Sequence, residues 1–392
     1  MVRSGQAHSD SFDERNAWIA FSCFPQIGPA RFKLLLKYFG NAQKAWGATT
    51  QEYIKLSLKN TFIADFGRFR EGFNLSSYLL RMEKLGVKVI TLEDSDYPEL
   101  LKKIDDSPYI LYVKDGGQNA PALDGTGQTK HRTERIGQFL NSPAVAVVGT
   151  RKMTAYGREV TERLVTGLVD SGVTIVSGLA LGIDAVAHKT ALDAGGYTIG
   201  VLGGGLDNIY PPSNKRLAQE MNASGRGIIV SEYPLGYPYL PQNFPTRNRI
   251  IAGMAYGVLV IEGAEKSGTL LTASAAARYG REVFSVPGPV TSLMSRAPHF
   301  LIKNGAKLVE KVEDILEELD VETKHKTQRV KRELPETEEE KKLFNILKSE
   351  PIDIDSLVRM SGLATGVVLS ALTIMELKGM LKNIGGVYTV ID

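Results

Sequence analysis

The sequence predicts an α/β protein whose largely parallel sheet is covered by helices on both faces. The basis is a series of apolar runs rich in Val and Ile, most of them separated by helical patterns. Strands that are apolar along their whole length are typical of parallel sheets buried on both faces. The runs expected to form strands are Ala144–Val148, Val173–Ser177, Tyr197–Leu202, Gly227–Ser231, Val258–Ile261 and Val283–Val286.

The region before the sheet is predicted to be a small helical domain over residues 1–90, with helices from residue 14 onward. The stretch PQIGPARFKLLLKYFG places a Gly-Pro turn before an apolar helix that ends at Gly40. This pattern is similar to helix-hairpin-helix and sterile-alpha-motif units. A plain helical bundle is the favoured interpretation of the residues alone.

The central domain is predicted to span residues 91–319. Around its start, GVKVITLEDSDYPELLKKIDDSPYILYVK indicates a strand, a helix and a second strand. Residues 115–142 are rich in Gly, Gln, Thr and Asn and show no apolar period, so we expect an inserted, mobile loop there.

The C-terminal part is predicted to be a winged helix over residues 337–392, joined by a charged linker over residues 320–336. Its short helix Ile354–Met360 is followed by a turn at Ser361-Gly362 and a longer helix, Thr365–Leu377. Two short strands are expected around Gly385-Gly386. The longer helix is largely apolar and contains no Lys or Arg, which favours a protein-packing or regulatory role over the reading of duplex DNA.

Composition excludes several classes of protein. The chain of 392 residues has a net charge of only +3, so a charged partner must be argued from local patches. Its one cysteine, Cys23, excludes a disulfide framework and favours a reducing compartment. With no apolar run of membrane length and no signal-peptide core, we expect a cytoplasmic protein that binds no membrane. The five histidines are scattered, so we expect no metal site and no cofactor.

The segments that follow the predicted strands point to one binding crevice, because the carboxyl ends of parallel strands meet at one edge of a sheet. These segments are rich in glycine and small hydroxyl residues, and Ser177-Gly178 and Ser267-Gly268-Thr269 are expected at helix starts that favour an anion. Basic residues surround them: Arg151, Lys152, Lys189, Lys215, Arg216, Arg247, Arg249 and Lys266. A single basic residue is usually a solvated surface charge. That interpretation is weaker for Arg151, which directly follows a buried strand, and for Lys215, which follows YPPSN.

The sequence offers no convincing set of catalytic residues. The candidate carboxylates are Asp184, Asp207, Glu232 and Glu262, and they form no acid–base pair that the spacing supports. We expect Asp184 to cap a helix beginning at Ala185, and His188 to pack in the core. GAEKSGT reverses the order of a Walker A motif, and no nucleophile elbow is present. We therefore predict a protein that is not an enzyme.

With these residues in view, the chain resembles the DNA-processing protein A (DprA, or Smf) family. The motifs that carry the resemblance are VAVVGTRKMTAYG, IVSGLALGIDAVAH, IGVLGGGLDNIYPPSN, SEYPLG, FPTRNRIIAGM, SGTLLTASAAARYGREVFSVPG and LIKNGAKLV. They cover residues 143–310 densely. The resemblance implies a Rossmann-like sheet domain that binds single-stranded DNA, dimerises through that domain, and helps to load RecA recombinase onto incoming DNA during natural transformation.

The resemblance also implies which residues contact DNA. Arg151 and Lys215 would line the DNA pocket, with the pair Arg247 and Arg249 beside it. The full predicted DNA-binding set is Gly149, Thr150, Arg151, Ser177, Gly178, Gly203, Gly204, Gly205, Asn214, Lys215, Arg247, Asn248, Arg249, Ser267, Gly268 and Thr269. Tyr210, Phe244 and Tyr156 are candidates for stacking on bases.

The sequence departs from the family pattern in three places within the sheet domain. Thr150 replaces the usual serine and keeps the hydroxyl, and Gly263 stands where the family usually has alanine. VTSLMSRAPHFLIKNGA replaces a loop that commonly contains a G-[TS]-N motif, so the family's contacts at that loop are not carried over to this chain.

Two other functions remain open at this stage. A nucleotide sensor or nucleoside-monophosphate hydrolase of a related Rossmann-like family is one alternative, but Thr272 stands where such a hydrolase needs a glutamate. The other is an adaptor whose winged helix binds a protein.

Overall fold

The computed structural model describes residues 12–116, 132–319, 335, 337–348, 351–378, 380–384 and 386–390. The chain divides into two compact units, residues 1–324 and residues 325–392, and each is described by itself. The predicted boundary between residues 1–90 and 91–319 falls inside the first unit and stays a prediction.

The first unit begins with helices, as predicted from the sequence. Aromatic rings fill the space between them, with Phe21 stacked on Phe66 at 5.5 Å and Trp18 edge-on to Phe32 at 4.7 Å between ring centroids. Gly40 ends the second helix at φ 88°, a conformation that favours glycine. The helices are α1 (Glu14–Ser22), α2 (Pro29–Phe39), α3 (Ala42–Gly47), α4 (Thr50–Ile54), α5 (Asn60–Gly72) and α6 (Leu75–Lys84).

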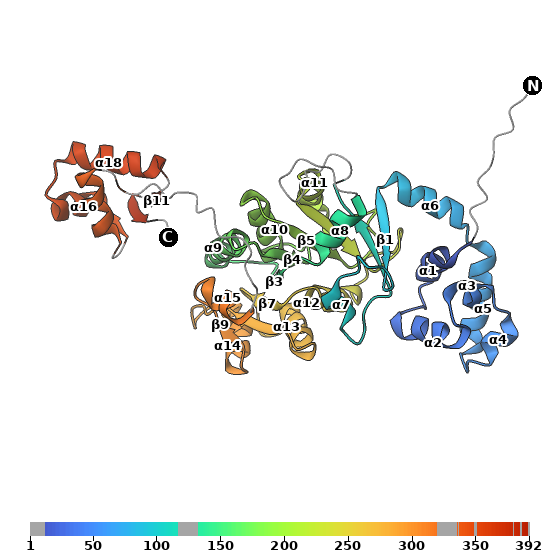
Figure 1. Ribbon diagram of the computed structural model, residues 1–392. Helices are drawn as coiled ribbons and strands as arrows, with labels where there is room; N and C mark the ends of the chain where they lie inside the picture. The colour runs from blue at the N-terminus through green and yellow to red at the C-terminus, as the bar shows by residue number, and fades with distance from the viewer. Residues whose placement is uncertain are drawn as a thin grey trace, which may run out of the picture. The chain divides into compact units, whose positions relative to one another are not determined.

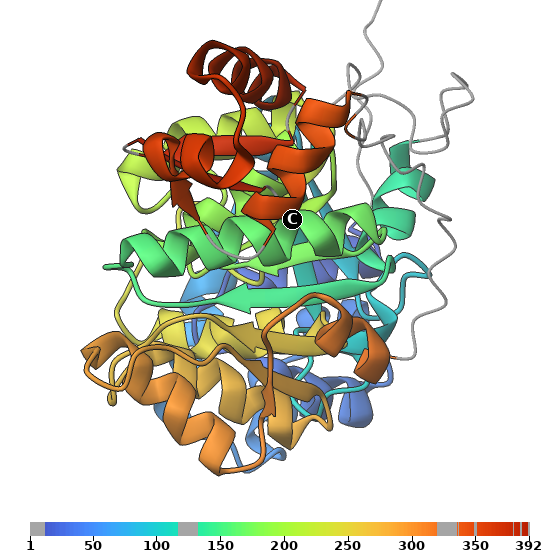
Figure 2. The same ribbon diagram turned by 90° about the vertical axis from the view of Figure 1, so that its left-hand side faces the viewer.

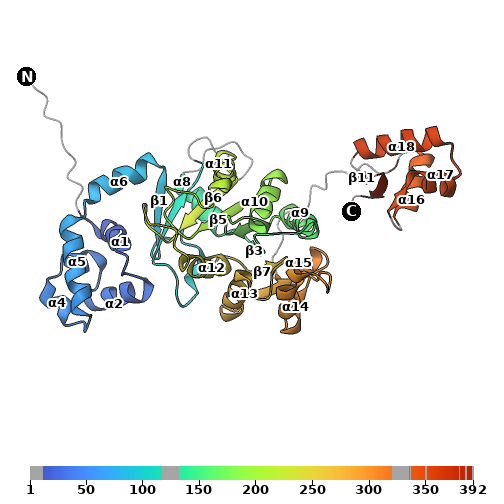
Figure 3. The same ribbon diagram turned by 180° about the vertical axis from the view of Figure 1, so that it is seen from behind.

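These helices pack against one edge of a nine-stranded sheet, where α6 contacts the edge strand β1 (Val87–Thr91) (Figure 3). The predicted strand–helix–strand segment forms β1, α7 (Glu99–Lys102) and β2 (Ile110–Lys114). Strand β2 is antiparallel to both of its neighbours, β1 and β6 (Gly227–Ser231). The first two strands therefore extend a sheet that is otherwise parallel.

The parallel strands run in the order β6-β5-β4-β3-β7-β8-β9. In this parallel part, β3 forms first in the chain and lies in the middle. Strands β4, β5 and β6 follow on one side of it, and β7, β8 and β9 then lie on the other side. The strand order therefore reverses between β3 and β7, the kind of position where open α/β sheets bind ligands beyond the strand ends. The bounds are β3 (Ala144–Val148), β4 (Thr174–Ser177), β5 (Thr198–Leu202), β7 (Gly257–Val260), β8 (Glu282–Ser285) and β9 (Lys307–Leu308).

Helices cover both faces of the sheet, which confirms the predicted α/β class. Helices α9 (Ala155–Asp170) and α10 (Ile183–Asp193) pack on one face, and α12 (Asn243–Gly253) and α13 (Gly268–Arg278) pack on the other (Figures 1 and 2). Their buried residues form two separate apolar clusters, one on each side of the strands. The remaining elements are the helices α11 (Lys215–Ala223), α14 (Arg296–Lys303) and α15 (Glu313–Leu319) and the short 3₁₀ turns η2 (Pro212–Asn214) and η3 (Leu293–Ser295).

The prediction of a loop over residues 115–142 is wrong at its C-terminal end. Residues Arg132–Leu140 form helix α8, whose side chains Ile136, Phe139 and Leu140 are buried against the sheet. These three residues follow the i, i+3, i+4 spacing of a helix face, which the polar residues around them obscure. Residues 117–131 of the predicted loop lie outside the described residues.

The second unit is a winged helix, as predicted. Its core contains Leu343, Leu357, Leu372 and Met375. Strand β10, which the sequence did not reveal, pairs with β12 in a sheet of order β10-β12-β11. The elements are α16 (Glu338–Leu347), β10 (Ile352–Asp353), α17 (Ile354–Ser361), α18 (Thr365–Leu377), β11 (Leu381–Ile384) and β12 (Val387–Val390). Apart from residue 335, the predicted linker lies outside the described residues.

Within the described residues, no single helix is long and apolar enough to cross a membrane. Two consecutive helical segments, Ile354–Ser361 and Thr365–Glu376, are together long and apolar enough by length and composition only, and they are bent by 114° relative to each other.

His188 packs in the core between α10 and β5, as expected. Its Nδ1 lies 2.6 Å from the hydroxyl of Thr198, and its buried Nε2 has no hydrogen-bond partner among the described residues. Burial, with a smaller contribution from the positive charge of Arg247, lowers the pKa of His188 from 6.5 to about 3. The folded protein therefore holds this ring neutral over a pH range in which the unfolded chain protonates it.

This difference predicts a loss of stability in mild acid. Below pH 6.5 the unfolded state binds a proton that the folded state excludes down to about pH 3, so the free energy of unfolding falls as the pH falls. The contribution of one such group is at most about 1.4 kcal/mol per pH unit. In His188→Gln this contribution disappears, so urea denaturation at pH about 7 and about 5.5 should show a weaker pH dependence than in the unaltered protein. Equal pH dependence in the two proteins would contradict the assignment.

Candidate nucleic-acid interface

The turns that follow β3 and β4 pack tightly against each other at the carboxyl edge of the sheet. The amide of Ile183 donates to the carbonyl of Thr150 at 3.2 Å. A Cβ on Gly149 would overlap the side chain of Ile183, and one on Gly182, at φ 76°, would overlap the Thr150 carbonyl. Gly149 is therefore required for the contact between the two turns.

The triple glycine after β5 is also covered by protein. Gly203, Gly204 and Gly205 are buried, and a Cβ on Gly204 would lie 2.8 Å from the ring of Tyr239. Gly178 faces the guanidinium of Arg247 in the same way. Gly268 differs, since its Cβ would meet no atom within 4 Å among the described residues beyond its chain neighbours and its own helix backbone. Most of the predicted glycines thus allow other residues of the protein to pack closely against the turns of the site.

The side chains of Arg247 and Asp184 form hydrogen bonds that hold the turn after β4 in place. The Arg247 side chain is buried and donates to the carbonyl of Gly178 at 2.6 Å and to that of Val201. The Asp184 carboxylate accepts from the amides of Gly178 and Ala180 at 3.1 and 3.4 Å. Burial raises the pKa of Asp184, while the charge of Arg247 opposes that rise. Burial likewise lowers the pKa of Arg247, and Asp184 opposes that fall.

The expectation that Asp184 caps a helix starting at Ala185 is wrong. Helix α10 already begins at Ile183, and Gly182 is its N-cap residue. Asp184 therefore lies inside the first turn, where its carboxylate reaches back to the preceding loop.

The side chain of Asn214 also holds the turn after β4, and Lys215 is the next residue in the chain. The amide of the buried Asn214 side chain donates to the carbonyls of Leu179 and Ala180, both at 2.9 Å. Lys215 follows as the first residue of α11, and its side chain is exposed. Asn214 thus fixes the start of the helix that presents Lys215 to solvent.

An aromatic cluster lies beside the exposed Arg151. Tyr210 stacks on Tyr239 at 5.4 Å and lies 5.8 Å from Phe244 between ring centroids. The guanidinium carbon of Arg151 lies 5.4 Å from the centre of the Phe244 ring. Tyr210 remains 44% exposed. Together with Gly178, Ala180, Leu181, Pro211 and Arg247, the residues Arg151, Tyr210 and Phe244 line a pocket of about 50 Å³.

Tyr239 was not among the predicted aromatic residues, although the run GYPYLP after β6 could have indicated it. Tyr156, which was among them, is engaged elsewhere: its hydroxyl donates to the carbonyl of Pro287 at 2.5 Å.

The hydroxyl residues of the predicted site are bonded within the protein. Ser177 is buried and donates to the carbonyl of Val147 at 2.7 Å. Ser267 caps α13, accepting from the Thr269 amide at 3.3 Å and from its hydroxyl at 2.9 Å. Asn248 reaches the same helix start, with its side-chain amide 3.4 Å from the Gly268 carbonyl.

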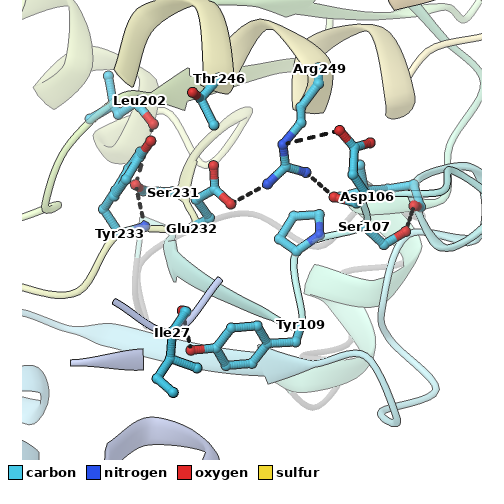
Figure 4. Close-up of polar contacts among 12 residues, drawn as sticks. Ile27, Asp106, Ser107, Tyr109, Leu202, Ser231, Glu232, Tyr233, Thr246 and Arg249 are labelled. Atoms are coloured by element: carbon cyan, nitrogen blue, oxygen red, sulfur yellow. Dashed lines mark hydrogen bonds and ion pairs between the residues drawn. The ribbon is translucent and has the colours of Figure 1, made fainter. Parts of the chain in front are cut away.

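Arg249 lies on the other side of α12 from Arg247. Its guanidinium donates to the carboxylate of Glu232 and to the carbonyl of Asp106, and all three residues appear together in Figure 4. Arg249 lines a separate cavity of about 710 Å³, formed by the N-terminal helices and the loops after β6 and before β2. The structure therefore brings Arg151 and Arg247 around one pocket and places Arg249 outside it. Lys215 is exposed at the start of α11, after Asn214, and does not line that pocket. Lys189 is ion-paired with Asp193 and Glu220 at 2.6 and 2.8 Å.

Two of the departures from the family pattern, Gly263 and the loop around η3, are in contact with each other. The amide of Gly263 donates to the carbonyl of Met294 at 2.7 Å, and the amide of Ala297 donates to the Gly263 carbonyl at 2.9 Å. A Cβ on Gly263 would lie 2.7 Å from the Thr269 hydroxyl and 3.0 Å from the Ala297 methyl. The glycine therefore allows the unusual loop around η3 to approach the start of α13.

Within the described ranges, no group of three or more His, Cys, Asp and Glu side chains could hold a metal ion.

Comparison with known proteins identifies the family. A Smf protein from Synechocystis is 34% identical over 403 aligned positions, which cover 94% of this chain and 97% of that protein. The chain belongs to the DNA-processing protein A family. Its residues 136–320 match the family model described as DNA recombination-mediator protein A, and residues 328–386 match the DprA winged helix domain.

Further members support this assignment. A Smf protein from Escherichia coli is 43% identical over 63% of this chain and 60% of its own length. The crystal structure of DNA processing protein A from Streptococcus pneumoniae superposes with a TM-score of 0.64 and 32% identity, covering 78% of this chain and 98% of that one. The Rossmann-like sheet implied by the resemblance is therefore confirmed.

The glycines around the crevice give a stability prediction. Gly149→Ala forces the new methyl group into Ile183, so we expect the free energy of unfolding to fall by about 1–3 kcal/mol. Gly268→Ala places the same group in open space at the start of α13 and should change it by less than about 0.5 kcal/mol. Urea denaturation of the two variants measures the difference, and equal stabilities would contradict the packing role of Gly149.

Proposed function

We propose that the crevice binds single-stranded DNA, and that the protein helps to load RecA recombinase onto incoming DNA during natural transformation. The observation that carries the DNA-binding part is the combination of exposed cations, Arg151 and Lys215, with the exposed ring of Tyr210. Cations that neutralise phosphates and aromatic rings that stack on bases are what proteins use to bind single strands. The family's description as a recombination mediator supports the RecA part.

The candidate carboxylates support a binding role without catalysis. Asp184 holds the turn after β4, and Asp207 and Glu232 are paired with Arg81 and Arg249. The Glu262 carboxylate accepts from the amide and the hydroxyl of Thr154 at 2.9 and 2.6 Å. Each carboxylate has a partner that explains its position.

We further propose that the protein acts in the cytoplasm as a homodimer formed through the Rossmann-like domain.

DNA binding by the crevice predicts a salt-dependent affinity. Each phosphate contact on a single strand contributes about 0.7 to the slope of log affinity against log salt concentration. Arg151→Ala with Lys215→Ala should therefore weaken binding and reduce this slope by about 1.4, as measured by fluorescence anisotropy of a labelled oligothymidylate. Lys102→Ala with Lys103→Ala, which removes two exposed lysines of the α7 region, is the matched control and should bind like the unaltered protein.

The outcomes separate the possible functions. If the unaltered protein fails to bind, or if the control pair weakens binding as much as the crevice pair, the crevice is not the DNA site. Displacement of the oligonucleotide by AMP at modest concentration would instead favour a nucleotide sensor or a hydrolase.

Stacking on Tyr210 predicts an effect of a different kind. Tyr210→Ala removes a ring but no charge, so the affinity for oligothymidylate should fall by about 1–3 kcal/mol while the salt slope stays the same. The same anisotropy titrations at several salt concentrations measure both quantities. An unchanged affinity would mean that the exposed face of Tyr210 is not a base-stacking surface.

A further inference from the structure

Helix α6 of the N-terminal region contacts both loops that carry the aromatic cluster. The Arg81 guanidinium is paired with the Asp207 carboxylate at 2.5 Å, and Asp207 lies in the same loop as Tyr210. The Tyr78 hydroxyl accepts a hydrogen bond at 2.9 Å from the amide of Leu235, which lies in the loop that carries Tyr239. A helix outside the crevice is thus bonded to each loop.

The two loops are in turn bonded to each other. The second oxygen of the Asp207 carboxylate accepts from the amide of Gly236 at 2.9 Å, so this one side chain joins α6 to both loops. The Gly205 amide donates to the Tyr237 carbonyl at 3.0 Å, and the Tyr239 hydroxyl donates to the Asn208 carbonyl at 2.6 Å. A shift of either loop would therefore move the other.

The contact between the loops leaves little space for movement. A Cβ on Gly205 would lie 2.5 Å from the Asp207 carboxylate and 2.6 Å from the Pro234 carbonyl. Tyr239, held between the loops, stacks on Tyr210 and on Phe244, whose ring also lies against Arg151. An unbroken series of contacts therefore runs from Arg81 to the crevice.

We propose that Arg81 and Tyr78 are positioning residues for the single-stranded DNA site, which hold the two loops in the arrangement that presents Tyr210 to a base. The proposal rests on the proposed function of the crevice. Its physical basis is preorganisation: a loop that is already ordered loses less conformational entropy when DNA binds. Removal of an anchor should weaken binding even though the anchor does not touch DNA.

The structure offers a matched control for the Arg81 ion pair. Arg68, on α5, is paired with Asp65 at the same distance of 2.5 Å, and its side chain contacts neither crevice loop in any bond that the described residues show. Arg81→Ala and Arg68→Ala remove the same charge from neighbouring helices, but the Arg81 pair is less exposed, with Asp207 17% exposed against 38% for Asp65. Because both arginines lie at the surface, both variants should fold, and Arg81→Ala should lower the thermal midpoint somewhat more than Arg68→Ala.

The experiment is the anisotropy titration with oligothymidylate at several salt concentrations. We expect Arg81→Ala to weaken binding about 3- to 10-fold with an unchanged salt slope, and Arg68→Ala to bind like the unaltered protein. Tyr78→Phe should weaken binding in the same way, and the two changes combined should have less than the product of their effects, because they release the same loops. Arg81→Lys should restore part of the affinity.

The results distinguish this proposal from the function on which it rests. If the unaltered protein binds and responds to the Arg151 and Lys215 changes, but Arg81→Ala behaves like Arg68→Ala, only the positioning role is overturned. If Arg81→Ala lowers the salt slope by about 0.7, Arg81 contacts a phosphate directly and is not a positioning residue. If the unaltered protein does not bind, the proposed function itself fails.

Discussion

The buried guanidinium of Arg247 is the interaction on which the crevice depends. It links the carboxyl ends of two neighbouring strands, since it donates to a carbonyl that follows β4 and to one at the end of β5. A buried cation is costly to desolvate unless charged and polar groups surround it. Asp184 supplies the opposite charge, and its carboxylate also holds the amides of the same turn. The turn is thereby fixed from its carbonyl side and from its amide side, which determines where Arg151 and the aromatic cluster can lie.

The residues of the site therefore fall into two sets: those bonded within the protein, which hold its shape, and those exposed to a ligand. Asn214 and Ser177 form side-chain hydrogen bonds within the protein, and all the predicted glycines except Gly268 pack against other residues there. Arg151, Lys215 and Tyr210 remain exposed on this rigid base. Such an arrangement suits a ligand that is recognised by charge and stacking, because neither interaction requires the site to rearrange when the ligand arrives.

The sequence predicted most of the sheet because its central strands are largely apolar and are bounded by turn residues, whereas the two-residue strand β9 is too short to show a pattern. Helix α8 was missed because its buried face has only three apolar residues, Ile136, Phe139 and Leu140, among polar neighbours. The sequence placed Arg247 and Arg249 at the start of a helix but did not show which cavities the two sides of that helix face. Once both lie on α12, residues two apart point in roughly opposite directions, and their side chains reach different cavities. The position of Tyr239 depends on how two loops from distant parts of the chain meet, which no local pattern records.

If the crevice binds DNA as proposed, the distribution of charge limits how the strand can be held. Of the basic residues that the sequence predicted around the crevice, Arg247 is buried, and Arg249 and Lys189 are paired with carboxylates. Arg247 cannot reach a phosphate without leaving its buried position, and Arg249 would have to give up a largely buried carboxylate partner, so these two add little to the attraction for a strand. The fewer phosphates the remaining exposed cations contact, the shallower the salt dependence and the larger the share of the affinity that has to come from stacking. The aromatic cluster then matters as much as the cations, which is why the bonds that hold its two loops bear directly on binding.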